Sequence, residues 1–501
     1  MIYSAPPMAI QFGTSGWRAV FADEFTYQNV RKLTHAIAGH VKESLEFGYR
    51  SPDYSARATK LPPGHPPMVV IGYDTRFQSE DFAREASEVF AADGVRAVVA
   101  DKDVPTPAVA WAILSNYAVG GVVITASHNP ARYNGYKWSP HWGGPAVPAV
   151  TDDIERRVGL LGNVNVAVMN AERAAREGWI VKKDFQKPYF QQLASLLDAK
   201  AIKGAKLKLG VDALNGAARL YLRPFLENLG ATVVGLRENR DVNFGGHSTE
   251  PAPELLGELA DVMKKKGLAL GLACDGDADR FGILDQGGVW IPPNDVLALA
   301  LDHLVRNRGY KGKVARSLMT SHFLDAVAKT HGLDVRETPV GFKYIGELLR
   351  GGGFIMGGEE SGGLSIQGHV PEKDGLLACL LMAELVAYDK KPLAKIREQL
   401  QKRVGSFFNM RKNFQLARAY EVTALEERLR SKPPLSLAGS SVWRIDQTDG
   451  FKFVMKDGSW MGLRSSGTEP VVRLYAEAGR KDKLDELVTA GENLIKGKSR
   501  V

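Results

Sequence analysis

Short apolar runs alternate with helical patterns along most of the chain. MVVIGY, LKLGV and KVARS are typical of strands, and each is followed by a polar loop rich in Gly, Asp or Ser. After each loop, apolar residues recur every three or four positions, as on one face of a helix. This alternation predicts sheets with parallel strands and helices on both faces. Ligands bind such sheets beyond the carboxyl ends of the strands, so we expect the functional groups on those loops.

The pattern changes after residue 410. The segment 417–430 predicts a helix, and the segment 440–464 predicts antiparallel hairpins with turns at Asp449-Gly450 and Asp457-Gly458. DKLDELVTAGENLI predicts a closing helix. We expect linkers in 143–185 and 401–411, and an inserted surface loop in the Pro- and Ser-rich segment 47–68.

Length and composition describe an ordinary folded protein. The 501 residues suffice for three or four domains at roughly 100–200 residues each. The net charge of +8 fits either an anionic partner or a solvated basic surface, and no basic stripe is interleaved with aromatics, so we expect no nucleic-acid partner. The most apolar stretch, LLACLLMAELVAY, contains Glu384 and is too short to span a bilayer. With no signal-peptide pattern and no CxxC spacing at Cys274 or Cys379, we expect a cytoplasmic protein without a membrane partner.

The run DGDADR follows the apolar run LALGLAC and carries three alternating carboxylates. Asp275, Asp277 and Asp279 can converge on one hard cation if the loop curls around it. An EF-hand is excluded, because Arg280 stands at its glycine position and Gln286 at its final glutamate position. A solvated acidic turn is the remaining alternative, and the position after a buried strand favours a metal site.

TASHNP, residues 125–130, follows the apolar run VGGVVI and offers a serine beyond a strand. Ser127 can meet a substrate there, although the same hexapeptide also suits an ordinary turn. His128 and Lys137 are candidates for moving protons, provided that burial or nearby positive charge lowers the pKa of the lysine. The GxSxG elbow of hydrolases is absent.

GGEESGG, residues 357–363, offers a carboxylate and a hydroxyl at alternate positions. In an extended loop Glu359 and Ser361 point the same way, which suits adjacent sugar hydroxyls. A Gly-rich turn with exposed acids is the alternative.

Two more loops carry hydroxyls and arginines. RSSGTEP, residues 464–470, followed by Arg473, resembles an anion nest, with a plain hairpin turn as the alternative. FGTSGWRA brings Thr14, Ser15 and Arg18 together in a Gly-bracketed loop.

FGTSGWRA, TASHNP with YNGYK, DGDADR, GGEESGG and RSSGTEP together, in this order, resemble the α-D-phosphohexomutase superfamily over nearly the whole chain. The resemblance implies an α/β protein of four domains around a central cleft, three with mixed sheets and a smaller α+β C-terminal domain. The expected ranges are 9–165 with the serine loop, 185–300 with the metal loop, 301–405 with the sugar-recognition loop and 411–501 with the phosphate-binding loop.

The resemblance also assigns roles to single residues. It makes Ser127 the phosphoserine, and the Mg²⁺ ligands are Ser127, Asp275, Asp277 and Asp279. Around the reacting phosphate it places Arg18, His128, Lys137 and Arg280. The substrate-binding set is Glu359, Ser361, Lys343, Arg464, Ser466, Gly467, Thr468 and Arg473. Relatives often carry Asn where this chain has Gly467, which leaves only a backbone contact there.

The implied reaction interconverts glucose 1-phosphate and glucose 6-phosphate through phospho-Ser127, with glucose 1,6-bisphosphate as intermediate and activator. Glu360 and the segment TPVGFKYI with Lys343 resemble the glucose-specific members, and a mannose-specific or dual enzyme is the alternative. A metal-dependent sugar phosphatase and a non-catalytic sugar-phosphate-binding protein are further alternatives. We expect a hexose phosphate as the partner and a monomer or weak dimer.

Overall fold

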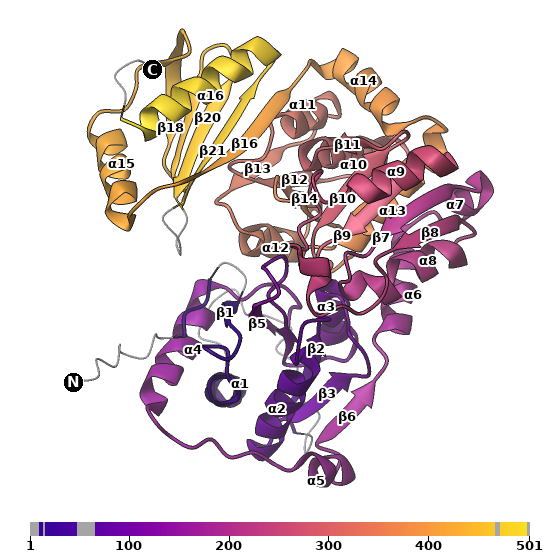
Figure 1. Cartoon of the computed structure of the whole chain (residues 1–501), viewed down its shortest axis with the longest axis vertical. Helices are drawn as coiled ribbons and strands as arrows, with labels where there is room; N and C mark the ends of the chain where they lie inside the picture. Colours follow the sequence, from indigo (N-terminus) through magenta and orange to yellow (C-terminus); the bar gives the residue numbers. More distant parts are fainter. Residues whose placement is uncertain (1–9, 14–15, 48–65, 466–470, 498–501) are drawn as a thin grey trace.

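The structure, a computed structural model, describes residues 10–13, 16–47, 66–465 and 471–497. Four sheets follow one another along the chain (Figure 1), and we number the domains I to IV after them. The predicted α/β architecture with mixed sheets in three domains and a smaller C-terminal domain is confirmed. Among the described helices, none combines the length and apolar character needed to cross a bilayer. Predictions that lie outside the described residues concern Thr14, Ser15, Ser466, Gly467, Thr468 and most of the segment 47–68.

Domain I contains a six-stranded sheet of order β1-β5-β4-β2-β3-β6. The strands β4, β2, β3 and β6 are parallel, whereas β5 and β1 add an antiparallel edge. The inner strands are buried on both faces, which explains their continuous apolar runs. Its elements are β1 (Trp17–Val20), α1 (Tyr27–Phe47), β2 (Met68–Tyr73), α2 (Ser79–Ala92), β3 (Arg96–Ala100), α3 (Thr106–Ser115), β4 (Gly120–Ile124), β5 (Tyr133–Pro140), α4 (Pro148–Leu161), α5 (Ala171–Arg176) and β6 (Ile180–Lys183).

The interpretation of 143–185 as a linker is wrong. This stretch contains α4, α5 and β6, and β6 pairs with β3 at the edge of the first sheet. The first sheet therefore continues beyond residue 165, the expected end of the first domain.

Domains II and III contain the second and third sheets, of orders β11-β10-β9-β7-β8 and β13-β12-β14-β15. In each sheet three strands are parallel, and the hairpin strands β10, β11 and β15 are antiparallel. The expected boundary at 300/301 falls inside α10, which packs on α11 and β14 of domain III.

The elements of domain II are α6 (Gln186–Leu196), α7 (Ala199–Ala205), β7 (Lys208–Asp212), the 3₁₀ turn η2 (Ala217–Leu220), α8 (Leu222–Asn228), β8 (Thr232–Leu236), the 3₁₀ turn η3 (Phe244–Gly246), α9 (Gly257–Lys266), β9 (Leu270–Cys274), β10 (Phe281–Asp285) and β11 (Val289–Ile291). Those of domain III are α10 (Pro293–Arg306), β12 (Lys313–Ser317), α11 (Phe323–Thr330), β13 (Val335–Thr338), α12 (Phe342–Gly351), β14 (Phe354–Glu359), β15 (Gly363–Ile366), α13 (Gly375–Asp389) and α14 (Leu393–Val404).

Helix α13 is the predicted buried helix. It packs against α7, β9 and β10 of domain II and against α10 and β15 of domain III, so apolar side chains cover nearly all of its surface. Glu384 lies inside it and is fully buried. The guanidinium of Arg308 forms an ion pair with this carboxylate, which compensates the buried charge.

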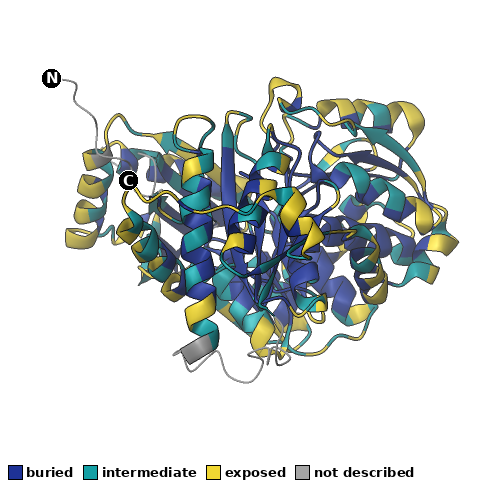
Figure 2. Ribbon diagram, turned by 90° about the horizontal axis from the view of Figure 1, so that it is seen from below, coloured by how far each residue is buried: buried dark blue, intermediate teal, exposed yellow. Residues whose placement is uncertain are grey.

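Domain IV contains an antiparallel sheet of order β16-β21-β20-β19-β18-β17, with the hairpins and closing helix that the sequence predicts. Its core is a separate apolar cluster, whereas one continuous core runs through domains I to III. The buried interior of the molecule is visible as dark blue strands and inner helix faces in Figure 2. The elements are β16 (Phe408–Gln415), α15 (Ala419–Ser431), β17 (Ser436–Leu437), β18 (Ser440–Asp446), β19 (Phe451–Met455), β20 (Trp460–Ser465), β21 (Val471–Ala478) and α16 (Lys481–Ile495).

Candidate active site

Ser127 lies on the loop after β4 in an unusual backbone conformation. Its φ of 53° is in the left-handed region, which few residues other than glycine adopt. Its N–H donates to Thr125 Oγ1 (2.9 Å), and its carbonyl accepts from Arg76 (2.6 Å) and from Thr249 Oγ1 of domain II (3.1 Å). Such conformations persist where the surroundings fix them, and they cluster at functional sites.

The three predicted metal ligands lie on the hairpin between β9 and β10 and face this serine. One oxygen of each carboxylate lies within 4.8 Å of the others, and all three residues are buried. Ser127 Oγ donates to Asp275 Oδ2 at 2.8 Å. Gly276 permits this approach, because a Cβ there would lie 2.6 Å from the Ser127 carbonyl oxygen. The structure thus brings together the serine and metal motifs, about 150 residues apart in sequence.

The acidic cluster fits a hard divalent cation. Burial and repulsion by Asp277 and Asp279 raise the pKa of Asp275 well above its usual range. Within the described part of the chain, Asp277 Oδ1 and Asp279 Oδ1 are buried and receive no hydrogen bond. Buried carboxylate oxygens without a hydrogen-bond donor are available as ligands for Mg²⁺, which prefers oxygen ligands.

Lys137 holds two of these aspartates. Its Nζ donates to Asp277 Oδ2 (2.5 Å) and Asp279 Oδ2 (2.9 Å). Burial lowers its pKa, but attraction by the two aspartates outweighs burial, so the pKa is raised. This raised pKa is the opposite of the lowered pKa that a proton shuttle would need.

Lys373 is a second cation at the cluster that the sequence interpretation did not include. Its Nζ lies 3.3 Å from Asp279 Oδ2 and donates to Glu372 Oε1 at 3.1 Å. Burial lowers its pKa, but attraction by Asp279, Glu372 and Glu359 outweighs burial and raises it. The only feature of the sequence that could have indicated Lys373 is its position between two acidic residues, just before an apolar helix.

His128 lies beside Ser127, and Arg280 and Arg18 are close enough to His128 to affect its charge. His128 Nδ1 lies 3.4 Å from Ser127 Oγ. Burial and the positive charges of Arg280 and Arg18 lower the pKa of His128 well below its usual value, so the ring is neutral near pH 7. Arg18 comes from β1 and donates to Asn129 of the serine loop at 2.9 Å.

The sugar-recognition motif forms a tight turn between β14 and β15, not an extended loop. Glu359 ends β14 and is buried, and Ser361 lies in the turn itself. Glu359 accepts a hydrogen bond from the Gly341 N–H at 2.8 Å, and burial together with repulsion by Glu360 raises its pKa to about 7. Lys343 lies in the first turn of α12, beside this loop. The alternative of an exposed acidic turn does not fit the burial of Glu359.

Arg464 and Arg473 of domain IV stand directly opposite each other on β20 and β21. Like charges at such positions repel, so the pair favours an anion between them. Arg473 Nε is buried and has no hydrogen-bond partner among the described residues. Burial and the nearby Arg411 and Arg464 lower the pKa of Arg473. The sequence interpretation missed Arg411, because only the strand register reveals that it shares this face.

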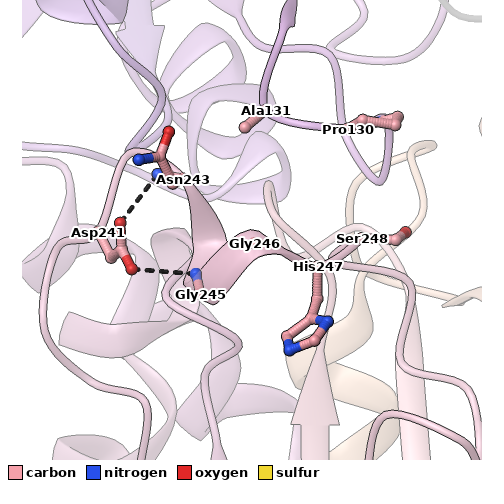
Figure 3. A pocket seen from close by; sticks show the side chains of 8 residues that line it. All are labelled: Pro130, Ala131, Asp241, Asn243, Gly245, Gly246, His247 and Ser248. Atoms are coloured by element: carbon pink, nitrogen blue, oxygen red, sulfur yellow. Dashed lines mark hydrogen bonds between the residues drawn. The ribbon is translucent and has the colours of Figure 1, made fainter.

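A cavity of about 570 Å³ lies beside the serine loop (Figure 3). Pro130 and Ala131 line one side, and a domain II loop that includes Asp241, Asn243 and His247 lines the other. The lining includes neither Ser127 nor the three aspartates, so this cavity flanks the site.

Models of the four domains of one family match the chain in order. They are the phosphoglucomutase/phosphomannomutase α/β/α domain I over residues 54–161, domain II over 187–288, domain III over 292–404 and the C-terminal domain over 412–491. The chain belongs to the phosphoglucomutase/phosphomannomutase family. Members of this family are mutases, which are isomerases, so the protein is an enzyme of this class. The predicted membership of the α-D-phosphohexomutase superfamily is confirmed.

Individual family members resemble the chain over most of its length. A phosphoglucomutase/phosphomannomutase of Thermococcus kodakarensis is 31% identical over 486 residues, 97% of this chain and 98% of its own. A phosphoglucomutase of Komagataeibacter xylinus is 30% identical over 507 residues, 94% of this chain and 87% of its own. A crystal structure from Thermus thermophilus, named as a phosphomannomutase, superposes with a TM-score of 0.82 at 31% identity and covers 99% of this chain and 100% of its own.

Proposed function

We propose that the protein interconverts glucose 1-phosphate and glucose 6-phosphate and carries the phosphoryl group on Ser127. The observation that supports this most is the 2.8 Å contact from Ser127 Oγ to Asp275, one of three buried carboxylates gathered at one point. A hydroxyl on a constrained loop beside a cation site is what a phosphoryl carrier requires.

Ser127, Asp275, Asp277 and Asp279 are the residues that would hold Mg²⁺. Bound there, the ion would neutralise the negative charge that phosphoryl transfer concentrates at this point. Arg18 and Arg280 add fixed positive charge on the other sides of the phosphoryl group.

The proposed transfer breaks the P–O bond of phospho-Ser127 as a new P–O bond forms to the free hydroxyl of the hexose phosphate. The proton of that hydroxyl passes to a neutral base and ends on Ser127 Oγ, the leaving oxygen. His128, which is neutral near pH 7 and lies 3.4 Å from Ser127 Oγ, is the candidate base. The product of this step is glucose 1,6-bisphosphate. It turns over in the site and returns its other phosphoryl group to Ser127, so added bisphosphate acts as an activator.

Glu359 and Ser361 would bind the sugar hydroxyls, and Arg464 and Arg473 the phosphate that does not react. A carboxylate fixed by a backbone N–H can accept hydrogen bonds from two hydroxyl groups in defined directions, which suits a sugar that must bind in two orientations. Two opposed arginines suit a phosphate dianion.

The choice of glucose rests on Glu360 and Lys343, and a mannose-specific or dual enzyme is the second candidate because both names occur among the relatives. Turnover of glucose 1-phosphate, mannose 1-phosphate and glucosamine 1-phosphate by the purified protein decides between them. Release of inorganic phosphate in place of an isomerised ester would contradict the mutase reaction and support a phosphatase.

Ser127→Ala tests the carrier. Without the hydroxyl we expect isomerisation to fall below detection while the fold is retained, and glucose 1,6-bisphosphate to add one phosphoryl mass to wild type alone. Ser115→Ala, at the exposed end of α3, is the matched control and should behave as wild type. Near-normal turnover by Ser127→Ala would refute the phosphoserine mechanism.

A further inference from the structure

Asp449 lies in the turn between β18 and β19 of domain IV, and its carboxylate accepts hydrogen bonds from two domains. Its Oδ1 accepts a hydrogen bond from Arg464 Nε at 2.9 Å, within domain IV. Its Oδ2 accepts from the backbone N–H of Val340 at 2.9 Å, in domain III. The side chains of Asp449 and Arg464 are only 23% and 17% exposed, so both bonds are partly shielded from water.

The loop that Asp449 contacts also holds the sugar-recognition carboxylate. Gly341, next to Val340, donates its N–H to Glu359 Oε1 at 2.8 Å. Gly341 has a φ of 129°, a backbone conformation open to glycine. The two consecutive N–H groups of Val340 and Gly341 donate to different carboxylates. One short loop of domain III therefore connects Glu359 to Asp449, and Asp449 connects the loop to Arg464.

Arg464 needs such a partner because of the charge opposite it. Arg473 faces it directly across the strand pair, and the repulsion favours a rotamer that turns Arg464 away. A carboxylate bonded to Nε fixes the guanidinium plane and directs its terminal nitrogens as a fork for phosphate oxygens.

We infer that Asp449 is a positioning residue that aligns Arg464 for phosphate and couples the phosphate-binding face of domain IV to the sugar-recognition loop of domain III. The inference rests on the proposed function, in which Arg464 binds the non-reacting phosphate. Closure of domain IV over the substrate then brings phosphate and sugar contacts into place together, because both depend on the loop at Val340 and Gly341.

A purely structural role in the hairpin turn is the competing explanation, and the chain contains a matched control for it. Asp457 lies in the next turn of the same sheet and is also followed by glycine. Its carboxylate accepts from Ser440 Oγ (2.6 Å), Ser459 N–H (3.0 Å) and Ser459 Oγ (2.5 Å), all within domain IV. Loss of Asp457 thus removes the support of a turn without removing a contact to domain III or to Arg464.

The kinetic test compares Asp449→Ala, Arg464→Ala, the double variant and Asp457→Ala in the full chain. Asp449→Ala should raise the KM for glucose 1-phosphate about tenfold, the effect of losing one charge-assisted hydrogen bond, with a smaller change in kcat. The effect on KM in the double variant should be clearly smaller than the sum of the two single effects, because Asp449 acts on the phosphate through Arg464. Asp457→Ala should lower the melting temperature and leave KM unchanged. An unchanged KM in Asp449→Ala, or additive effects in the double variant, would overturn the inference.

Hydrogen exchange measures the coupling without turnover. The amide of Val340 should exchange faster in Asp449→Ala than in wild type, and it should stay protected in Arg464→Ala and Asp457→Ala. Unchanged protection of this amide in Asp449→Ala would contradict the coupling. If wild type isomerises no hexose phosphate, the proposed function fails, and affinities of the same variants for inorganic phosphate replace KM as the test of alignment.

Discussion

Arg76 has no exposed surface, and its five N–H donors support the loop that carries Ser127. Nε donates to Asp74 Oδ2 at 3.1 Å. The terminal nitrogens donate to four backbone carbonyls of the loop, those of Ser127, Asn129, Pro130 and Tyr133. This one side chain therefore holds the left-handed backbone at Ser127, and its planar fork has no equivalent in lysine.

Arg76→Lys keeps the charge and removes the fork. We expect the free energy of unfolding to fall by about 3–6 kcal/mol, because at least two bonds from a charged donor are lost at about 1.5–3 kcal/mol each. We expect kcat to fall about 10–100-fold, because Ser127 Oγ leaves its fixed position. Denaturant unfolding and steady-state kinetics measure both, with Arg84→Lys on the exposed face of α2 as control. Normal kcat in Arg76→Lys would show that the loop holds its shape without the fork.

Glu359 should impose a pH dependence on substrate binding. Its pKa is raised to about 7 by burial and by Glu360, so the carboxyl becomes protonated below pH 7 and loses its charge. The KM for glucose 1-phosphate should therefore rise by up to about tenfold per pH unit below 7. In Glu359→Gln this dependence should disappear, leaving only the ionisation of the substrate phosphate, which affects both proteins. Parallel pH profiles for the two proteins would contradict the role of Glu359.

The same raised pKa predicts the direction of a stability change. A carboxyl whose pKa is raised in the folded state contributes stability that is fully present at pH values below its ordinary pKa. This stability is lost as the pH rises through about 7. Glu359→Gln should consequently be more stable than wild type above pH 7, in thermal unfolding at matched ionic strength.

Sequence motifs indicated the residues that we propose for the chemistry, but not the residues that hold them in place. Ser127 and the three aspartates were predicted because their residue types and loop positions are informative by themselves. Arg76, Lys373 and Asp449 were missed, because their roles depend on partners brought close only by the fold, such as Val340, 109 residues from Asp449. The direction of the Lys137 pKa shift was likewise not predictable, because it depends on two aspartates that lie 140 and 142 residues away in the sequence.

Helix α13 joins domain III to the metal loop through its first residue. The Gly375 N–H donates to the Ala278 carbonyl at 3.0 Å, between Asp277 and Asp279. A Cβ at Gly375 would clash with the carbonyl oxygen of Arg280, and backbone cannot move aside as a flexible side chain can. The close approach of this helix therefore fixes the curl of the loop that gathers the carboxylates.

Gly375→Ala should displace the metal loop. We expect weaker Mg²⁺ binding by about tenfold or more and a loss of about 1–3 kcal/mol in stability, the usual cost of forcing extra volume into a packed site. Isothermal titration with Mg²⁺ and thermal unfolding measure these effects. Gly257→Ala is the matched control, since Gly257 also begins a helix and a Cβ there meets no atom within 4 Å. Equal Mg²⁺ affinity in the two variants would contradict the role of α13.

The alternation of strands and helices was predictable because the inner strands are apolar on both faces and the helices are periodic. The segment 143–185 was not, because β6 and α5 lack those signals and the longer helix α4 buries only Val150 and Ile154. β6 is a four-residue edge strand whose residues are all partly or fully exposed, and α5 has six residues with one buried. Short elements at the edge of a sheet bury too little apolar surface to leave a pattern in the sequence.

At the scale of the molecule, domain IV has its own core, and its junction with domain III combines polar contacts with a small apolar cluster. Its core cluster does not continue into the core of domains I to III. At the junction Glu477 of β21 accepts from the His322 N–H (2.9 Å) and from Trp460 Nε1 (2.8 Å), beside a small apolar cluster that includes Met319 and Tyr475. Figure 1 shows this domain, in orange to yellow, beside domain III. A unit with its own core can rotate as a rigid body, which a site that must bind both ends of one sugar requires.

Retention of the bisphosphate should depend on domain IV. After the first transfer the intermediate carries two phosphates, and the arginines of β20 and β21 would bind the one that is not at Ser127. Arg464→Ala should let glucose 1,6-bisphosphate escape more often before it returns a phosphoryl group. Each escape leaves Ser127 unphosphorylated and the enzyme inactive, so the variant should lose activity progressively during turnover.

Added glucose 1,6-bisphosphate should restore that activity by rephosphorylating Ser127. The bisphosphate concentration that gives half-maximal activation should be about tenfold higher for Arg464→Ala than for wild type, because one charge-assisted hydrogen bond is lost. Phosphorus NMR of the reaction should detect free bisphosphate with the variant at substrate concentrations where wild type releases little. Arg480→Ala, an exposed arginine of the same domain paired only with Asp482 among the described residues, is the control and should need no more bisphosphate than wild type. Equal activation curves for Arg464→Ala and wild type would mean that other contacts retain the intermediate, and that domain IV contributes to substrate entry alone.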